Sequence, residues 1–288
     1  MNRFCLITNY GKSENEQMIQ HIVQYLEQRG KSCQVMENDR YDIGGIRHFT
    51  NVSQIPDDMD CAIVLGGDGT MIQAAIDLVH QDLPILGVNT GTLGFLTETD
   101  CQNIDAALDK LIQGDYTIER RIMLKETQKF PGENSRTSCY ALNDMVVSKA
   151  GDCRLITIKV YLNQELVDIY RADGLIVSTP TGSTGYNLSA GGPVLVPGLQ
   201  ATVVTPICPH SLNKRSLLLD AQDQIMLEIG RTKEMAEDQA VFIADGRTVG
   251  NLRTGDRLLI QVPHATTELI KLSGISFYER MREKLNGN

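Results

Sequence analysis

A change in hydrophobic pattern near residue 118 constrains the fold of this chain more than any other sequence feature. Before it, short apolar runs alternate with amphipathic helical patterns; after it, apolar runs follow one another and are separated by Gly, Asn and Asp. Alternating strands and helices build a parallel sheet covered by helices, whereas consecutive strands build antiparallel sheets. The 288 residues are enough for about two domains of ordinary size. We therefore expect an α/β domain with a parallel sheet over residues 1–118, an all-β sandwich over 119–265, and a further C-terminal segment over 266–288.

The N-terminal part divides into strands and helices by periodicity and capping residues. The run Asp60–Leu65 is apolar almost throughout and ends at glycines, which is typical of a strand covered on both faces. In the first helical pattern, Ser13 and Glu16 form a capping box and Gly30 follows the last turn. The expected strands are Arg3–Thr8, Cys33–Met36, Asp60–Leu65 and Pro84–Val88, and the expected helices are Ser13–Arg29, Thr70–His80 and Ile104–Ile112.

The C-terminal part consists almost entirely of strand patterns. Asn163-Gln164 separates two of them and predicts a tight hairpin turn. A helical pattern returns over Ser276–Leu285. The expected strands are Ile122–Glu126, Cys139–Val147, Leu155–Val160, Glu165–Tyr170, Leu175–Ser178, Ala201–Ile207, Gln224–Ile229, Gln239–Ile243, Arg257–Val262 and Glu268–Leu272.

The balance of charge limits the possible partners. Lys and Arg number 27 and Asp and Glu number 36, so the formal net charge is −9. A protein that binds nucleic acid neutralises phosphates with an excess of basic residues, so we expect no nucleic-acid partner. Individual phosphate groups are not excluded, because glycine-rich backbone and a divalent cation bind them without many lysines.

Cysteines and hydropathy indicate the compartment. The seven cysteines are dispersed, without a CxxC pair or a cluster with metal-ligand spacing, so neither a zinc site nor a disulfide framework is predicted. No apolar run approaches the roughly 18 residues of a membrane-spanning helix. The apolar stretch Phe4–Thr8 is too short for a signal peptide. We expect a cytoplasmic protein that has no membrane partner.

The most informative short motif is the turn in CAIVLGGDGTMIQAAI, where Gly66, Gly67 and Gly69 surround Asp68. The glycines let backbone N–H groups approach an anion closely, and the helix that follows from about Thr70 adds free N–H groups and the positive end of its dipole. The turn therefore suits phosphate oxygens. A carboxylate repels phosphate unless it binds Mg²⁺ or accepts a proton from an attacking hydroxyl. A β–α turn without a ligand is the alternative, and the central carboxylate argues against it.

A second motif lies in the run RADGLIVSTPTGSTGYNLSAGGPVL. Its loop from Thr179 to Tyr186 carries four Ser or Thr hydroxyls and one Tyr ring, which suits a nucleoside because hydroxyls bond base edges and sugar while the ring stacks on the base. A solvated loop without a ligand is the alternative. Asn143-Asp144 interrupts the apolar strand YALNDMVVS, so at least one of the two side chains faces a core or a site. A strand end or a bulge would also account for this pair.

Together these motifs resemble those of the NAD kinase (ATP-NAD kinase) family. The family's GGDG turn is matched by Gly66–Gly69, its NTGxLGFL stretch by Asn89–Leu96, its Asn-Glu/Asp pair by Asn143-Asp144, and its DGLxxSTPTGSTAY-type run by Asp173–Tyr186. The similarity extends from the first strand to about Asp245. The GGDG turn alone would indicate only a wider group that includes sugar-phosphate and lipid kinases, and the complete set is more specific.

The resemblance implies Mg²⁺-dependent transfer of the γ-phosphoryl group of ATP to the 2′-hydroxyl of the adenosine ribose of NAD, which gives NADP. It also implies an α/β domain joined to a β-sandwich, a final helix that packs back on the N-terminal domain, and a homodimer or homotetramer formed through the β domains. The choice between ATP and polyphosphate, the acceptance of NADH and feedback by NADPH stay open.

The resemblance further implies a role for each matching residue. Asp68 is the expected catalytic carboxylate, which orients or deprotonates the 2′-hydroxyl. Arg171 stands where members that prefer NAD⁺ over NADH carry a basic residue, and Gly185, where alanine is commoner, contacts the ligand through its backbone. The other expected contacts are Gly66, Gly67, Gly69 and Thr70 with phosphates, Asn143, Thr181 and Thr184 with the adenine, Asp144 and Tyr186 with the ribose, Phe95 in the wall of the same pocket, and Asp173, Ser189 and Asp245 with the nicotinamide half, partly across a subunit boundary.

Two other functions stay open on the sequence alone. A lipid or sugar-phosphate kinase of the same superfamily would need an apolar acceptor pocket or several cationic ligands, and residues 171–193 provide neither. A catalytically silent dinucleotide-binding regulator would keep the nucleoside loop but would not need Asp68.

Overall fold

The structure is a computed structural model that describes residues 1–8, 13–36, 41–43, 46–91, 94–127, 138–151, 154–211, 213–232 and 237–285. The chain forms two compact units. The first contains Met1–Asp42, Arg47–Arg121 and Thr267–Asn288, and the second contains Ile43–Ile46 and Ile122–Thr266. No helix in the described ranges is long and apolar enough to cross a membrane.

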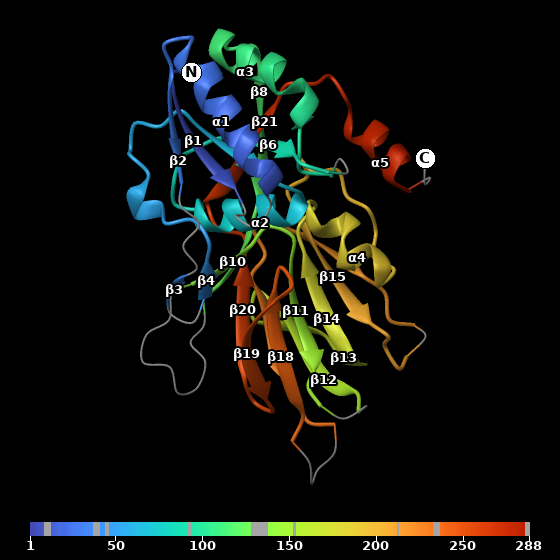
Figure 1. Cartoon of the computed structure of the whole chain (residues 1–288). Helices are drawn as coiled ribbons and strands as arrows, with labels where there is room; N and C mark the ends of the chain where they lie inside the picture. The colour runs from blue at the N-terminus through green and yellow to red at the C-terminus, as the bar shows by residue number, and fades with distance from the viewer. Residues whose placement is uncertain are drawn as a thin grey trace. The chain divides into compact units, whose positions relative to one another are not determined.

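A seven-stranded sheet forms the centre of the first unit (Figure 1). Its neighbouring pairs β1–β2, β1–β5, β5–β6 and β6–β21 are parallel, so the carboxyl ends of β1, β5 and β6 meet at one edge. In order across the sheet, the strands are β2 (Ser32–Val35), β1 (Arg3–Thr8), β5 (Cys61–Leu65), β6 (Ile85–Asn89), β21 (Thr266–Lys271) and β8 (Thr117–Ile122), with β7 (Thr99–Asp100) beside β6.

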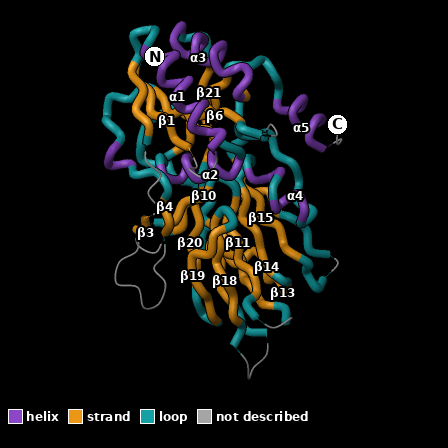
Figure 2. Tube along the Cα trace, in the orientation of Figure 1, coloured by secondary structure: helices purple, strands orange, loops and turns teal. Residues whose placement is uncertain are grey.

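Helices cover both faces of this sheet, which explains why β5 is buried along its whole length. On one face, α1 (Ser13–Glu27) and α3 (Ile104–Gln113) pack over alternate strand residues in one apolar core that includes Phe4, Ile63 and Leu108 (Figures 1 and 2). On the other face lies α2 (Asp68–Asp77), whose Met71 sulfur is so close to β6 that a Cβ on Gly87 would meet it at 2.8 Å. Short 3₁₀ turns occupy Val52–Gln54 and Cys101–Asn103.

The second unit is a sandwich of two six-stranded antiparallel sheets. Apolar side chains from the facing sides of both sheets fill one core, in which Tyr170 and Phe242 are the largest fully buried side chains. One sheet runs β10 (Cys139–Ala141), β9 (Leu124–Glu126), β20 (Arg257–Gln261), β17 (Ile225–Ile229), β12 (Ile156–Leu162) and β13 (Glu165–Ala172), and the other runs β16 (Leu217–Asp220), β15 (Ala201–Ile207), β14 (Gly174–Ser178), β11 (Asp144–Lys149), β18 (Gln239–Ala244) and β19 (Arg247–Arg253).

The remaining elements are short. A turn of 3₁₀ helix, η3 (Gly182–Thr184), and a one-turn helix, α4 (Tyr186–Ser189), follow β14. Helix α5 (Phe277–Leu285) ends the described chain, and β3 (Tyr41–Ile43) pairs with β4 (Ile46–His48) in a separate two-stranded sheet.

The expected fold class is confirmed: a parallel α/β sheet and an antiparallel β unit occupy the two parts of the chain, and the final helix belongs to the first unit. Glu268–Leu272, a strand expected within the C-terminal segment 266–288, forms β21 of the α/β sheet, where Leu269 pairs with Ile85 and Ile270 enters the core beneath the helices. One strand expectation was wrong in detail. The expected strand Cys139–Val147 is two strands, separated at Leu142 and Asn143.

Candidate active site

The glycine-rich turn lies at the carboxyl edge of the parallel sheet, directly after β5. The N–H of Gly66 donates to the carbonyl of Val88 on β6 (3.0 Å), which fixes the start of the turn. A Cβ on Gly66 would lie 2.4 Å from Oγ1 of Thr70, so a larger residue does not fit there. Gly67 precedes the first helical residue and caps α2 without a side-chain hydrogen bond. With Gly67 and Gly69 exposed, the first turn of α2 offers backbone N–H groups to an anion.

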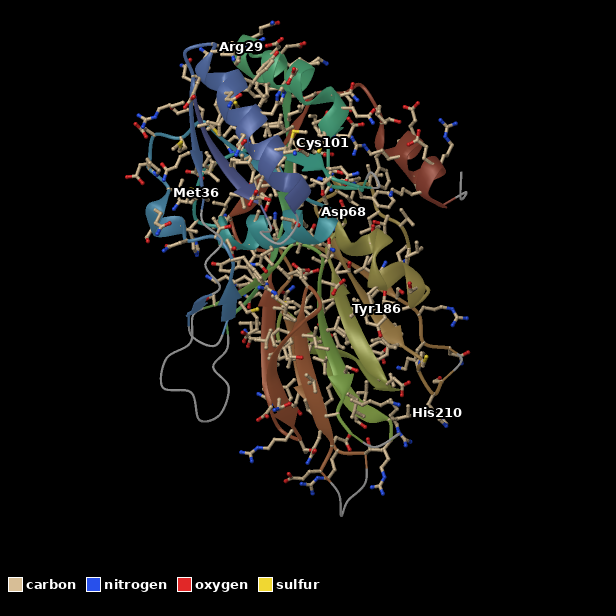
Figure 3. All side chains as sticks on the ribbon, viewed as in Figure 1. Arg29, Met36, Asp68, Cys101, Tyr186 and His210 are labelled. Atoms are coloured by element: carbon tan, nitrogen blue, oxygen red, sulfur yellow. The ribbon has the colours of Figure 1, made fainter. Side chains whose placement is uncertain are left out.

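Asp68 is the first residue of α2 (Figure 3), two residues earlier than the expected helix start. Its side chain is half-buried, and each carboxylate oxygen accepts one backbone hydrogen bond: Oδ2 from the N–H of Phe95 (2.8 Å) and Oδ1 from the N–H of Leu96 (3.0 Å). Two fixed donors restrict the orientation of the carboxylate, while each oxygen keeps a further lone pair that can accept a hydroxyl proton.

Gly94 is a site residue that the sequence analysis did not single out. A Cβ at this position would lie 1.9 Å from Oδ1 of Asp68, so the close approach of the 94–96 segment to the carboxylate requires a glycine. Gly94 could have been identified from the sequence by its position in the motif Asn89–Leu96, one residue before Phe95. Phe95 itself is half-buried beside Asp68 and contacts it through its backbone.

In the second unit, Asn143 and Asp144 lie where β10 ends and β11 begins. Asp245 causes this break: its backbone has a φ of 43°, and its carboxylate accepts hydrogen bonds from the N–H groups of Leu142 (2.7 Å), Asn143 (2.9 Å) and Asp144 (3.0 Å). These three N–H groups therefore do not take part in the hydrogen bonds between strands. Asp245 therefore positions the Asn143-Asp144 pair, which gives it a structural role in addition to the ligand contact that the resemblance implies.

Asp144 is a carboxyl of the candidate site whose pKa its surroundings strongly raise. Its residue is only 7% exposed. Burial, and next the neighbouring Asp245 carboxylate, raise the pKa of Asp144 to about 7. A carboxyl with such a pKa in a site can accept or donate a hydrogen bond near neutral pH.

The hydroxyl-rich loop after β14 divides into buried and accessible residues. Thr179 and Ser183 are fully buried and hold the loop: Oγ1 of Thr179 donates to the carbonyl of Leu142 (2.6 Å), and Oγ of Ser183 donates to the carbonyl of Pro180 (2.6 Å). A Cβ on Gly182 would lie 2.2 Å from the carbonyl oxygen of Asn143, so the loop packs directly on the Asn143 backbone. The accessible residues are those expected to bind: Thr181 and Thr184 are half-buried, and Gly185, Tyr186 and Ser189 are exposed.

Arg171 and Asp173 lie at the other end of β14 from this loop. Gly174 begins that strand and Ser178 ends it, so the two groups are separated by about 13 Å of strand. Asp173 accepts a bond from Nζ of Lys149 (2.5 Å). The structure thus brings Asn143 and Asp144 to the hydroxyl-rich loop but does not bring Arg171 and Asp173 there within one chain.

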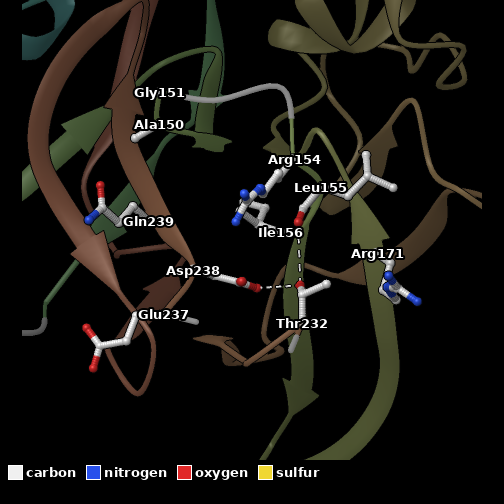
Figure 4. Close-up of a pocket in the computed structure, with 10 residues that line it drawn as sticks. All are labelled: Ala150, Gly151, Arg154, Leu155, Ile156, Arg171, Thr232, Glu237, Asp238 and Gln239. Atoms are coloured by element: carbon white, nitrogen blue, oxygen red, sulfur yellow. Dashed lines mark hydrogen bonds between the residues drawn. The ribbon is translucent and has the colours of Figure 1, made fainter. Parts of the chain in front are cut away.

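Arg171 lines a pocket of about 480 Å³ (Figure 4). Arg154 contributes a second guanidinium to the pocket, and Asp238 accepts a bond from Oγ1 of Thr232 (2.6 Å) across its wall. The other lining residues are Ala150, Gly151, Leu155, Ile156, Glu237 and Gln239.

The described residues contain no group of three or more His, Cys, Asp and Glu side chains that could hold a metal ion. The turn at 66–69 instead offers the single carboxylate of Asp68. This donor set fits Mg²⁺ in its usual nucleotide mode, in which one or two carboxylates and the substrate phosphates share the ion and water completes its shell.

A carboxylate held at the start of a helix within a glycine-rich turn, in a chain that has an α/β unit and a β-sandwich unit, defines the class of kinases with a GGDG motif. Within that class, two family models match the chain: the ATP-NAD kinase N-terminal domain over residues 4–116 and the ATP-NAD kinase C-terminal domain over residues 142–272. The chain belongs to the ATP-NAD kinase family.

Individual relatives agree with this assignment. The chain is 43% identical to an NAD kinase of Lachnoclostridium phytofermentans, with 99% of both chains covered, and 41% identical to an NAD kinase of Lachnospira eligens, with 99% of this chain and 100% of the relative covered. Among solved structures, its fold is similar to a yeast NADH kinase complexed with NADH (TM-score 0.83, 22% identity, 100% of this chain and 88% of the other covered). It is also similar to an NAD kinase from Archaeoglobus fulgidus in complex with ATP (TM-score 0.75, 21% identity, 99% of both covered).

Proposed function

We propose that this protein transfers the γ-phosphoryl group of ATP to the 2′-hydroxyl of the adenosine ribose of NAD, giving NADP and ADP. The observation that carries the proposal is the Asp68 carboxylate, which is oriented by two backbone N–H groups at the start of α2 within the family's GGDG turn. Its spare lone pairs suit the acceptance of a proton from a hydroxyl, and the adjoining N–H groups suit phosphate oxygens.

In this mechanism the residues of the turn position the reactants. A ribose hydroxyl is a weak nucleophile, so the rate depends on in-line placement against the phosphorus and on a nearby proton acceptor. The 2′-oxygen forms a bond to the γ-phosphorus, the bond from that phosphorus to the bridging oxygen breaks, and ADP leaves. Asp68 orients the 2′-hydroxyl and accepts its proton. The backbone N–H groups of Gly67 and Gly69 hold phosphate oxygens, Thr70 contributes its side-chain hydroxyl, and Gly66, whose N–H donates to Val88, shapes the turn.

We also propose that Asp68 contributes to holding Mg²⁺ together with the phosphates of ATP. When bound, the ion would neutralise charge on the phosphate oxygens and so make the phosphorus easier to attack. The acidic net charge of −9 is consistent with this role, because the chain as a whole has no excess of basic residues.

The accessible residues of the second unit suit the adenosine of NAD. Asn143, Thr181 and Thr184 offer amide and hydroxyl groups for the adenine edge. Asp144 suits the ribose diol, because a carboxylate can accept from two hydroxyls. The Tyr186 ring, 48% exposed, is available to stack or to bond the sugar. The family resemblance also assigns a contact with NAD to Phe95, a half-buried residue beside Asp68.

The nicotinamide half of NAD requires residues that one chain does not supply at the same place. Arg171 and Asp173 are separated from the nucleoside loop by the length of β14. We therefore propose a homodimer or homotetramer in which a second copy brings its Arg171 and Asp173 to this half, beside Ser189 and Asp245, and in which Arg171 favours NAD⁺ over NADH.

Exposed apolar side chains support an assembly through the β units. Leu166, Val167 and Ile169 lie on β13, which is an edge strand of one sheet, and Leu218 lies on β16, which is an edge strand of the other. These four residues form what we call the edge patch. Apolar side chains on unpaired edge strands indicate a surface that another protein covers.

The cysteines support a cytoplasmic location, which we also propose. All six that the structure describes are free thiols. Burial raises the pKa of Cys5 and of Cys33 to about 12, so neither thiol forms a reactive thiolate at neutral pH. Dispersed, unpaired cysteines are typical of a reducing compartment.

An assay for NADP tests the function directly. The purified protein is incubated with Mg²⁺ and NAD, with ATP in one series and polyphosphate in another, and NADP is measured for the wild type, Asp68→Asn and Asp82→Asn. We expect Asp68→Asn to lower kcat about 100-fold or more, since it removes the proton acceptor. Asp82→Asn, an exposed carboxylate of the same unit, serves as the matched control and should match the wild type. A wild type that makes no NADP with either donor would overturn the proposal.

A further inference from the structure

Glu98 carries a buried carboxylate that none of the sequence motifs explains. Its side chain is 1% exposed and receives bonds from Nζ of Lys271, the N–H groups of Leu272 (3.0 Å) and Ser273 (2.7 Å), Oγ of Ser273, and Nη2 of Arg280 (2.8 Å). Burial by itself would raise the pKa of Glu98, but the hydrogen bonds from Lys271 and Ser273 outweigh it, and the pKa lies below its ordinary value. The group is therefore an ionised carboxylate inside the first unit.

Arg280 of α5 joins this carboxylate to the backbone. It is 4% exposed, and while Nη2 donates to Glu98, Nη1 donates to the carbonyl of Thr97. A guanidinium can do this because its donors diverge in one rigid plane, whereas a lysine ammonium is a single point of charge. One side chain thus fixes two consecutive residues of the chain.

Thr97 and Glu98 are the last residues of the segment 94–98, whose backbone binds Asp68. The N–H of Gly94 donates to Oγ1 of Thr97 (3.0 Å), the N–H groups of Phe95 and Leu96 donate to Asp68, and the N–H of Glu98 donates to the carbonyl of Gly87 on β6 (2.8 Å). The segment 94–98, which we call the 94–98 bridge, therefore connects Asp68 to β6 and to Arg280. Asp68 accepts hydrogen bonds from the middle of this segment, and β6 and Arg280 are bonded to its last two residues.

We propose that Arg280 and Glu98 are positioning residues for Asp68, which fix the 94–98 bridge and thereby orient the carboxylate on the reacting hydroxyl. The proposal rests on the function proposed above, because it assigns these residues to the same reaction. Neither residue touches substrate in this role. Small errors in the placement of a catalytic group lower the rate steeply, so loss of the bridge's anchor should lower kcat rather than weaken binding.

A purely structural role is the competing explanation. Arg280 and Glu98 also attach the chain after β21 to the first unit. On this explanation their loss would lower the free energy of unfolding and would have no specific effect on kcat. The two explanations differ in whether the loss of kcat depends on the Asp68 carboxylate. A double-mutant cycle measures that dependence by comparing the loss in the presence and absence of this carboxylate.

The test uses the full chain and compares Arg280→Met, Arg280→Lys and Arg282→Met in the wild-type and Asp68→Asn backgrounds. Arg282 is an exposed arginine of the same helix and provides the matched control. Circular dichroism first establishes that each variant is folded at the assay temperature. Values of kcat and of KM for NAD and ATP are then measured, together with amide hydrogen exchange of the 94–98 segment without substrates.

We expect Arg280→Met to lower kcat by about 10–100-fold with less than about a threefold change in either KM. Arg280→Lys should recover part of the rate, since it retains a charge for Glu98 but not the forked geometry. In the Asp68→Asn background Arg280→Met should cause no further loss, and exchange at 94–98 should become faster. Arg282→Met should behave as the wild type throughout.

Two results would overturn the positioning role: an unchanged kcat in folded Arg280→Met, or the same fold loss in both backgrounds. The failure of the proposed function is recognised separately, as a wild type that makes no NADP. Even then the exchange measurement decides the inference, because unchanged exchange at 94–98 in Arg280→Met would show that Arg280 does not hold the partners of Asp68.

Discussion

Two aspartates of the candidate site are held in opposite ways, and the difference can be measured residue by residue. Asp68 is half-buried and receives two backbone N–H groups, whereas Asp144 is buried beside a second carboxylate. In the part of the chain that the structure describes, no cation pairs with Asp144. The ionised form of Asp144 therefore lowers the free energy of unfolding of the free protein. This destabilising carboxylate lies where the ribose hydroxyls are expected to bind.

Replacement of Asp144 by asparagine should make the protein more stable and less active. With a pKa of about 7 in the folded protein and about 4 in the unfolded chain, Asp144 makes folding less favourable as the pH rises from 4 to 7. Asp144→Asn should remove this dependence and raise the free energy of unfolding at pH 8 by about 2–4 kcal/mol. Chemical denaturation at pH 5 and pH 8 measures the difference.

The same variant should lose at least about tenfold in kcat/KM for NAD, because the ribose loses a charged hydrogen-bond acceptor. Asp82→Asn, which changes an exposed carboxylate, should alter neither quantity. If Asp144→Asn left the stability difference between pH 5 and pH 8 as it is in the wild type, the raised pKa would be wrong.

At the scale of single elements, the hairpin between β12 and β13 departs from the usual residue preference. Asn163 and Gln164 form its two-residue turn, with φ values of 51° and 75°, between the paired residues Leu162 and Glu165. Such a turn favours Asn at the first position and Gly at the second. Asn163 also bonds Asp223 through its side chain (2.7 Å), so the strain resides at Gln164.

Gln164→Gly should therefore stabilise the protein by about 0.5–1 kcal/mol, because glycine adopts positive φ without steric cost. Thermal unfolding should show a higher Tm than the wild type. Glu165→Gly places the same change one residue later, inside β13, and should lower the Tm. A Tm for Gln164→Gly at or below that of the wild type would contradict the prediction.

At the scale of the whole molecule, the proposed assembly would bring residues from opposite ends of β14 to one reaction. The exposed edge patch of Leu166, Val167, Ile169 and Leu218 would provide the apolar surface for it. Each copy would then complete the site of another, so that activity depends on assembly.

A charged edge patch should separate the copies. Ile169→Lys combined with Leu218→Lys should convert the oligomer into a monomer, as measured by light scattering after size exclusion. The double variant should also lower kcat/KM for NAD about 100-fold or more, because a second copy no longer supplies Arg171 and Asp173. Ile118→Lys, at an exposed position of β8 in the first unit, is the control. An active wild-type monomer would contradict the assembly.

The sequence by itself determined the features that neighbouring residues decide. The strand–turn–helix around Gly66–Gly69 follows from local periodicity and glycine content, and the hairpin turn at Asn163-Gln164 was placed correctly for the same reason. The family motifs and the division into an α/β part and a β part were also readable, because each depends on the order of residues along the chain.

Only the tertiary structure decided the contacts between distant residues. Asp68 and Phe95 are 27 positions apart, Asp245 and Asn143 are 102 apart, and Arg280 and Glu98 are 182 apart. The same reason explains why Glu268–Leu272 could not be assigned to its sheet: its pattern predicts a strand, but its partner β6 is far away in sequence. Local pattern encodes the conformation of a segment, whereas hydrogen-bond partners and burial depend on which segments the folded chain brings together.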